Sequence, residues 1–91
     1  MAIVTLRYWA AAKEAAGLAE EKVEADTLAA AIAAALAAAR SRPGDHADRL
    51  KLVMARSSYL VNGEPAGTRA AQVVALPDDA LVEVLPPFAG G

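Results

Sequence analysis

The sequence predicts an α+β fold in which a mixed β-sheet carries one main helix packed on one face and a protruding C-terminal tail. Three observations predict this fold. Apolar side chains alternate with other residues near both ends of the chain, an alanine-rich run of helical character lies between them, and an Asn-Gly pair joins two further extended runs. With 91 residues and no cysteine, the chain is expected to form one small core without a disulfide framework.

The first predicted strand covers residues 2–9. Val4, Leu6 and Tyr8 fall on one side of an extended chain and polar side chains on the other, which is the two-residue period of a half-buried strand. Trp9 ends this run, and at that position an indole ring is expected either in the core or in a partner interface.

A short helix and a second strand are predicted next. Residues 10–16 are strong helix formers, and Gly17 is suited to end a helical turn in the left-handed conformation. Residues 20–25 then alternate charged and small apolar side chains, with Val23 as the best core candidate of a more exposed strand. The two strands are close enough in sequence to pair as an antiparallel hairpin with a long connection.

The main helix is predicted after Thr27, whose side chain can cap it. Leu28, Ile32 and Leu36 recur every four residues and are expected to line one face. Pro43-Gly44 should close the helix. The next apolar run, in residues 45–57, fits either a helical turn or an irregular packed segment, and the sequence leaves both interpretations open.

A hairpin and a final strand complete the prediction. Residues 58–61 form a strand that ends at Asn62-Gly63, a pair suited to the positive φ angles of a tight turn. Pro65 removes a donor from the returning strand and implies a sheet edge. The pattern between residues 67–75 is weak. After a turn at Pro77, the run over residues 81–85 predicts the last strand, which should lie centrally.

A ubiquitin-like β-grasp is the most economical arrangement of these elements, with the first and last strands side by side in the middle of the sheet. Residues 1–85 are then the predicted domain, and residues 86–91 are an extended tail. Pro86 and Pro87 cannot donate to a ladder, so pairing should stop where they begin.

The tail ends in Gly90-Gly91, so no side chain lies next to the terminal carboxylate. This end of the backbone is narrow enough to enter a narrow cleft in another protein. Phe88 has little core to join so close to the end of the chain, so we expect it to contact a partner. Without cysteine, any sulfur chemistry must use a partner's thiol or the terminus itself.

Composition excludes several classes of function. A formal charge of -2 argues against a broad phosphate-binding surface, so no nucleic acid partner is expected. The longest apolar run, residues 28–39, falls short of the roughly 20 residues that span a bilayer, and the amino terminus lacks the basic region of a secretory signal. We therefore expect a cytoplasmic protein that binds neither membrane nor nucleic acid.

The sequence also lacks the groups of a self-sufficient enzyme, since it pairs no nucleophile with a base and has no glycine-rich phosphate loop. His46 lies beside Asp45 and Asp48, but no second histidine completes a metal site, so none is expected. Asp78 and Asp79 follow a proline and are expected to form a turn rather than an acid and base pair.

Three runs carry a resemblance that covers nearly the whole chain: R-Y-W-A-A-A-K-E-A-A-G, Y-L-V-N-G and V-E-V-L-P-P-F-A-G-G. Together they resemble the small subunit of molybdopterin synthase, the MoaD-type sulfur carriers of the ThiS/MoaD family. The resemblance implies that the carboxylate of Gly91 is adenylated with ATP by a partner, is converted to a thiocarboxylate, and donates its sulfur to a pterin precursor.

The resemblance further implies two protein partners and no permanently bound cofactor. The partners are an E1-like adenylating and sulfurtransferase enzyme, which uses the ATP, and the large synthase subunit, with which a heterotetramer is expected. The residues expected to bind these partners form the tail and its base: Leu85, Pro86, Pro87, Phe88, Ala89 and Gly90.

Two positions depart from the family pattern. Lys13 stands where arginine is common, and arginine and lysine differ in donor geometry. The usual Gly-Asp-Glu turn before the last strand is Asp78-Asp79-Ala80 here, without the glycine. The pathway that receives the sulfur also stays open, because carriers for thiamine, cysteine or tRNA thiolation need the same tail. A ubiquitin-like modifier and a binding module with an accidental Gly-Gly end are the remaining alternatives.

Overall fold

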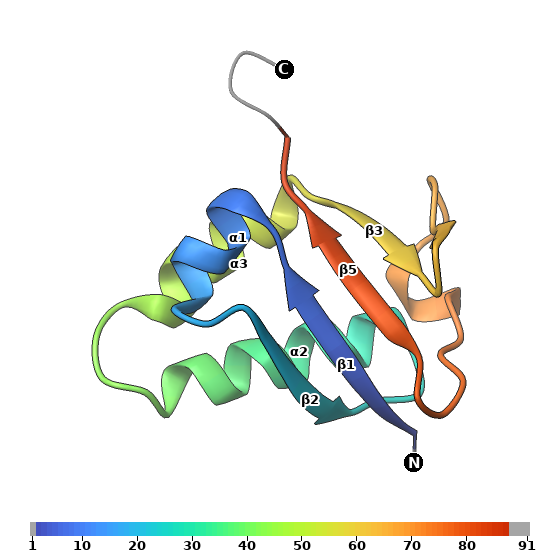
Figure 1. Cartoon of the computed structure of the whole chain (residues 1–91), viewed down its shortest axis with the longest axis horizontal. Coiled ribbons are helices and arrows are strands. Elements are labelled where there is room, and N and C mark those ends of the chain that lie inside the picture. Colours follow the sequence, from blue (N-terminus) through green and yellow to red (C-terminus); the bar gives the residue numbers. More distant parts are fainter. Residues whose placement is uncertain (1, 88–91) are drawn as a thin grey trace.

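The computed structural model describes residues 2–87, which form a five-stranded mixed sheet with helices on one face (Figure 1). The elements follow in the order β1 (Ile3–Tyr8), α1 (Ala10–Ala16), β2 (Glu20–Glu24), α2 (Leu28–Arg40), α3 (His46–Ala55), β3 (Ser58–Val61), β4 (Glu64–Pro65), a 3₁₀ turn η1 (Ala71–Val73) and β5 (Leu81–Leu85). The predicted α+β class is confirmed.

The strands lie in the order β2-β1-β5-β3-β4, so the first and last strands occupy the middle of the sheet as predicted. β1 and β5 run parallel, and the other neighbouring pairs are antiparallel. Figure 1 shows β1 and β5 side by side, with α2 behind them. Since the crossover between these strands contains most of the chain, the sheet brings residues from both ends together.

The core lies between the sheet and the helices. Val4, Leu6 and Tyr8 of β1 are at most 2% exposed, and Val82 and Val84 of β5 are completely buried. The alternation predicted for both strands is therefore confirmed. Because successive side chains of a strand point to opposite faces, the intervening residues of β1 and β5 lie on the face that no helix covers.

The main helix α2 begins as predicted, with the Oγ1 of Thr27 accepting a hydrogen bond from the backbone N–H of Ala30 at 3.1 Å. Its buried face differs from the prediction. Leu28 is buried, but Ile32 and Leu36 are only half-buried. Alanines fill the most deeply buried positions of the helix, namely Ala31, Ala35 and Ala39. Small side chains allow the helix to approach its neighbours closely, and the larger ones pack at the sides.

The segment that the sequence left undecided is the helix α3. Leu50 and Met54 are buried on it, whereas Leu52 is 71% exposed. α3 packs against both the main helix α2 and α1, the short helix predicted over residues 10–16, so the helical layer contains a third helix. The helical period was hidden because an exposed leucine lies between the two buried residues.

The predicted turns are confirmed. Asn62 and Gly63 have φ angles of 51° and 82°, and Pro65 lies on the edge strand β4. Asp78 belongs to a turn, where its Oδ1 accepts the backbone N–H of Ile3 at 2.8 Å. Asp79 has a φ of 63°, a left-handed conformation, whereas Asp78, at the position of the missing glycine, is not among the residues with positive φ.

Candidate functional site

The candidate site begins where the central strand β5 ends at Leu85. Pro86 is buried and Pro87 is exposed, so the first proline still packs against the domain. Neither can donate a ladder hydrogen bond, which explains why pairing stops at this point. The other predicted tail residues, Phe88, Ala89, Gly90 and Gly91, lie outside the described residues, and their roles stay predictions.

Trp9 lies beside this end of β5. Its backbone N–H donates to the carbonyl oxygen of Val84 at 3.2 Å. Its indole Nε1–H donates to the Oε2 of Glu83 at 3.0 Å, and the side chain is 45% exposed. Trp9 is therefore not a core residue. The sheet brings together a tryptophan and a glutamate that lie 74 positions apart in the sequence.

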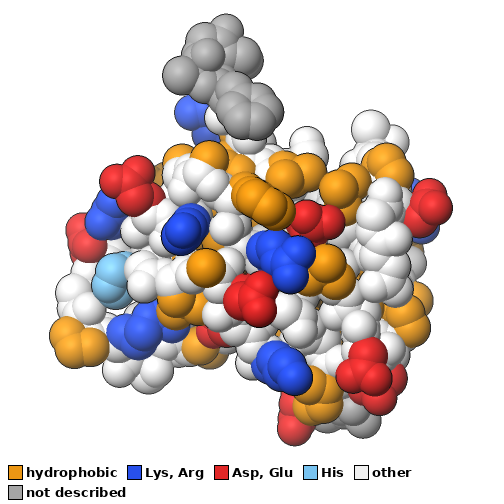
Figure 2. All heavy atoms as spheres, viewed as in Figure 1, with side chains coloured by type: hydrophobic (Ala, Val, Ile, Leu, Met, Phe, Trp, Pro, Cys, Tyr) orange, Lys and Arg blue, Asp and Glu red, His pale blue; other side chains and the backbone are white. Residues whose placement is uncertain are grey.

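The sheet face opposite the helices, here called the open face, surrounds this pair. Four cross-strand neighbours define its middle row: Glu20, Arg7, Glu83 and Leu60. Figure 2 shows this face, with hydrophobic side chains gathered at the end of the sheet where β5 finishes and charged ones interspersed across the rest. Glu83 shares this face of β5 with Leu81 and Leu85, and the sequence did not identify Trp9 as its partner.

The charges of the middle row are partly paired. The Nε of Arg7 lies 3.0 Å from the Oε2 of Glu20, and both side chains are exposed by 40% or more. An exposed ion pair contributes little to stability, on the order of 0.5 kcal/mol. Its consequence for the open face is mainly geometric, because it draws the guanidinium of Arg7 toward β2.

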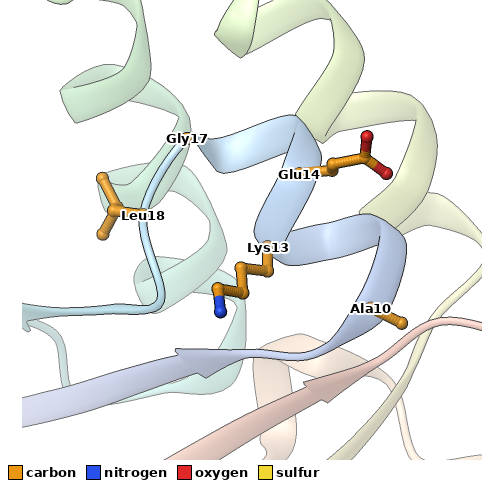
Figure 3. A pocket seen from close by; sticks show the side chains of 5 residues that line it. All are labelled: Ala10, Lys13, Glu14, Gly17 and Leu18. Carbon is orange, nitrogen blue, oxygen red and sulfur yellow. The ribbon is translucent and has the colours of Figure 1, made fainter.

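A shallow, open depression lies beside α1 (Figure 3). Its lining residues are Ala10, Lys13, Glu14, Gly17 and Leu18. The side chain of Lys13 points toward β1, whereas that of Glu14 points to the opposite side of the helix. The structure thus places Lys13, where the resemblance expects arginine, on the surface close to the open face. Ala10 has an unusual φ of 48° at the start of the helix.

His46 packs against the end of α1. Its Nδ1 lies 3.0 Å from the carbonyl oxygen of Ala15, and Arg42 donates to the carbonyl oxygen of Ala16 at 2.6 Å. Asp45, one of the two carboxylates beside His46 in the sequence, has its Oδ1 3.9 Å from the Nη1 of Arg49. Within residues 2–87, no three histidine, cysteine or acidic side chains gather in a way that could hold a metal ion.

Tyr8 is buried and Tyr59 is half-buried, and both have structural roles. The O–H of Tyr8 donates to the Oε2 of Glu21 at 2.6 Å, and burial followed by this hydrogen bond raises the pKa of Tyr8. The O–H of Tyr59 donates to the carbonyl oxygen of Met54 at 2.7 Å, and burial raises the pKa of Tyr59 to about 12. Both phenols thus stay protonated near neutral pH, where they cannot act as bases.

No helix in the described part of the chain is long and apolar enough to cross a bilayer. Neither the protein-family models nor the curated protein sequences yield a match for the chain. Solved structures do resemble it. One is small archaeal modifier protein 1 (SAMP1) from Methanosarcina acetivorans, with a TM-score of 0.78 and 21% identity over 100% of this chain and 98% of that one.

Two further structures are similar over almost their whole length. "Putative molybdopterin converting factor, subunit 1" from Pyrococcus furiosus has a TM-score of 0.71 and 20% identity, over 97% of this chain and 100% of that one. SAMP1 from Haloferax volcanii has a TM-score of 0.70 and 26% identity, over 98% of this chain and 99% of that one. These neighbours are ubiquitin-like β-grasp proteins, so the predicted fold and the predicted resemblance are both confirmed.

Proposed function

We propose that the chain is a sulfur carrier of molybdenum cofactor biosynthesis, which bears the sulfur as a thiocarboxylate on Gly91. One observation carries the proposal: the central strand of a β-grasp sheet ends at Leu85 and leads, through two prolines, to a sequence that finishes in Gly-Gly. The likeness to a protein described as a molybdopterin converting factor subunit supports this choice of pathway.

The proposed chemistry needs a terminal carboxylate and a partner enzyme. A carboxylate is a poor acyl donor, so an oxygen of Gly91 first attacks the α-phosphorus of ATP, and pyrophosphate leaves. Sulfide supplied by the partner then attacks the acyl-adenylate, and AMP leaves as the carbon–sulfur bond of the thiocarboxylate forms. Two glycines allow the partner to enclose the reacting carbon closely without a clash of side chains.

The partners in this proposal are an E1-like adenylating enzyme and the large subunit of molybdopterin synthase, the latter in a heterotetramer. The carrier supplies the reacting atom and a surface to hold, while the partners supply catalysis. The open face lies next to the base of the tail, so a partner that grips this face can receive the tail at the same time.

A ubiquitin-like modifier is the second candidate, because two of the similar structures described above are small archaeal modifier proteins. In that function, the activated carboxylate of Gly91 forms an isopeptide bond with a lysine of a target protein. Adenylation is common to both candidates, and they differ only in the nucleophile that receives the acyl group.

Intact mass measurement separates the two candidates. The chain is incubated with ATP, an adenylating enzyme and a sulfur donor, and a sulfur carrier gains the mass difference between sulfur and oxygen. A modifier appears instead as a covalent conjugate with another protein. A variant lacking Gly91 is the control, and it should keep its fold by circular dichroism but gain no sulfur. Sulfur loading of that variant would contradict the sulfur-carrier candidate, and its conjugation to another protein would contradict the modifier candidate.

A further inference from the structure

We propose that Trp9, Leu60, Glu83 and Leu85, here called the docking patch, bind a protein surface that presents an arginine to Glu83 among apolar side chains. The proposal rests on the proposed function, because it takes the adenylating enzyme as the partner. It adds the chemistry by which that partner recognises the carrier, separately from the tail.

The docking patch is a preorganised surface. Trp9 is held twice, by its backbone N–H on Val84 at 3.2 Å and by its indole N–H on Glu83 at 3.0 Å. Fixing an exposed ring in one orientation costs side-chain entropy, and a ring that is already fixed loses less on binding. Tryptophan is also one of the residue types enriched among interface hot spots, the few residues that contribute most of the binding free energy.

The backbone supports this orientation at a cost. Ala10, which directly follows Trp9, has a φ of 48°, a conformation that residues other than glycine rarely adopt. Strain of this kind persists where the surrounding structure requires it, and it is concentrated at functional sites. Here the turn at Ala10 takes the chain from β1 into α1 and leaves the indole ring on the open face.

Glu83 determines which partner the patch accepts. Its cross-strand neighbour on β3 is Leu60, and Leu85 follows it on the same face of β5; all three side chains are half-buried. The Oε2 of Glu83 accepts from Trp9, but among residues 2–87 its Oε1 has no hydrogen-bond partner. A purely apolar partner would bury this carboxylate without a counter-charge, which is strongly unfavourable.

Glu83 forms no ion pair with a cation of the described residues. Its cross-strand neighbour Arg7 forms its ion pair with Glu20 instead. The partner must therefore bring the charge. Arginine fits better than lysine, because a guanidinium can donate to the carboxylate while its plane packs on an aromatic ring, and Trp9 offers that ring beside Glu83.

Trp9 is the only tryptophan of the chain, which makes the docking patch directly observable. Full-length carrier labelled with 5-fluorotryptophan should give a single fluorine NMR signal from Trp9. Titration with the adenylating enzyme should shift or broaden this signal and yield a Kd. Because the readout is binding rather than sulfur transfer, it does not depend on the chemistry at Gly91.

Charge variants then test the role of Glu83. Glu83→Lys should raise the Kd by about tenfold or more, because a cation would face the partner's arginine. Glu83→Gln keeps an acceptor for Trp9, so it should raise the Kd less and also weaken its dependence on salt. Glu24→Lys is the matched control, with the same change of charge on the exposed edge strand β2, and it should change the Kd by less than about twofold.

The outcomes separate this proposal from the proposed function. Equal effects of Glu83→Lys and Glu24→Lys would overturn the docking patch, as would tighter binding of Glu83→Gln. Thermal unfolding of each variant checks that the fold is kept, and Glu83→Gln supplies the answer if Glu83→Lys fails to fold. Sulfur loading of the chain without Gly91 would instead overturn the proposed function and leave the Kd measurements valid.

Discussion

Asn62 and Leu81 bond to each other reciprocally across the sheet: the Oδ1 of Asn62 accepts the backbone N–H of Leu81 at 2.9 Å, and the backbone N–H of Asn62 donates to the carbonyl oxygen of Leu81 at 2.8 Å. The turn residue of the hairpin thereby holds the first residue of β5. Because β5 leads into the tail, this contact links the hairpin to the strand on which the candidate site depends.

Asn62→Ala should lower the free energy of unfolding by about 2 kcal/mol, because it removes the acceptor for Leu81 and places alanine at a φ of 51°. Asn62→Gly loses the same acceptor without the unfavourable backbone conformation, so it should cost about 1 kcal/mol. Urea unfolding of both variants measures the difference. Equal losses would show that the positive φ carries no cost.

Gly17 lies so close to His46 that a Cβ atom on it would be 2.8 Å from the Cε1 of the imidazole ring, and its φ is 79°. Gly17→Ala should therefore cost about 2 kcal/mol or more in unfolding free energy. In a His46→Ala background the clash is gone and only the backbone cost, about 1 kcal/mol, should remain. An equal cost in both backgrounds would contradict the role of the imidazole contact.

Ala10 offers the opposite change, since glycine suits its φ of 48°. Ala10→Gly should raise the unfolding free energy by about 0.5 kcal/mol, the relief of the backbone strain exceeding the entropy that glycine adds to the unfolded chain. Ala11→Gly, one position later on the same helix, should lower it by about 1 kcal/mol. Thermal unfolding of the pair is the measurement, and destabilisation of similar size in both variants would contradict the strain.

The elements that the sequence predicted best are those whose burial follows a simple period. Val4, Leu6 and Tyr8 alternate along β1, and all three are buried. The α3 segment was undecided because Leu52, exposed by 71%, lies between Leu50 and Met54 and hides their four-residue spacing. Local pattern is therefore reliable where every apolar residue is buried, and ambiguous where one apolar side chain faces solvent.

The candidate site was predictable only in part, for a different reason. The tail residues are contiguous, so the sequence could single them out as candidates, and their roles stay predictions. Trp9 and Glu83 became neighbours only through the parallel pairing of β1 with β5, whose register is a tertiary property. The alternation of the sequence predicts which residues of β1 and β5 share a face. Which of them are cross-strand neighbours, as Arg7, Glu83 and Leu60 are, depends on the register of each strand pair.

Stability should fall as the pH rises above 10, because burial raises the pKa of Tyr59 from 10.0 to about 12 in the folded protein. The unfolded chain loses this proton first, so it binds fewer protons than the folded chain and is favoured as the pH increases. The stabilisation is fully present below pH 10 and is lost as the pH rises to about 12. The raised pKa of Tyr8 acts in the same direction.

Urea unfolding between about pH 9 and 11 tests this dependence. The unfolding free energy of Tyr59→Phe should fall less over this range than that of the wild type. Tyr59→Phe should also have the lower unfolding free energy at about pH 9, because it lacks the hydrogen bond to Met54. Parallel curves for the two proteins would contradict the contribution of Tyr59 to this fall.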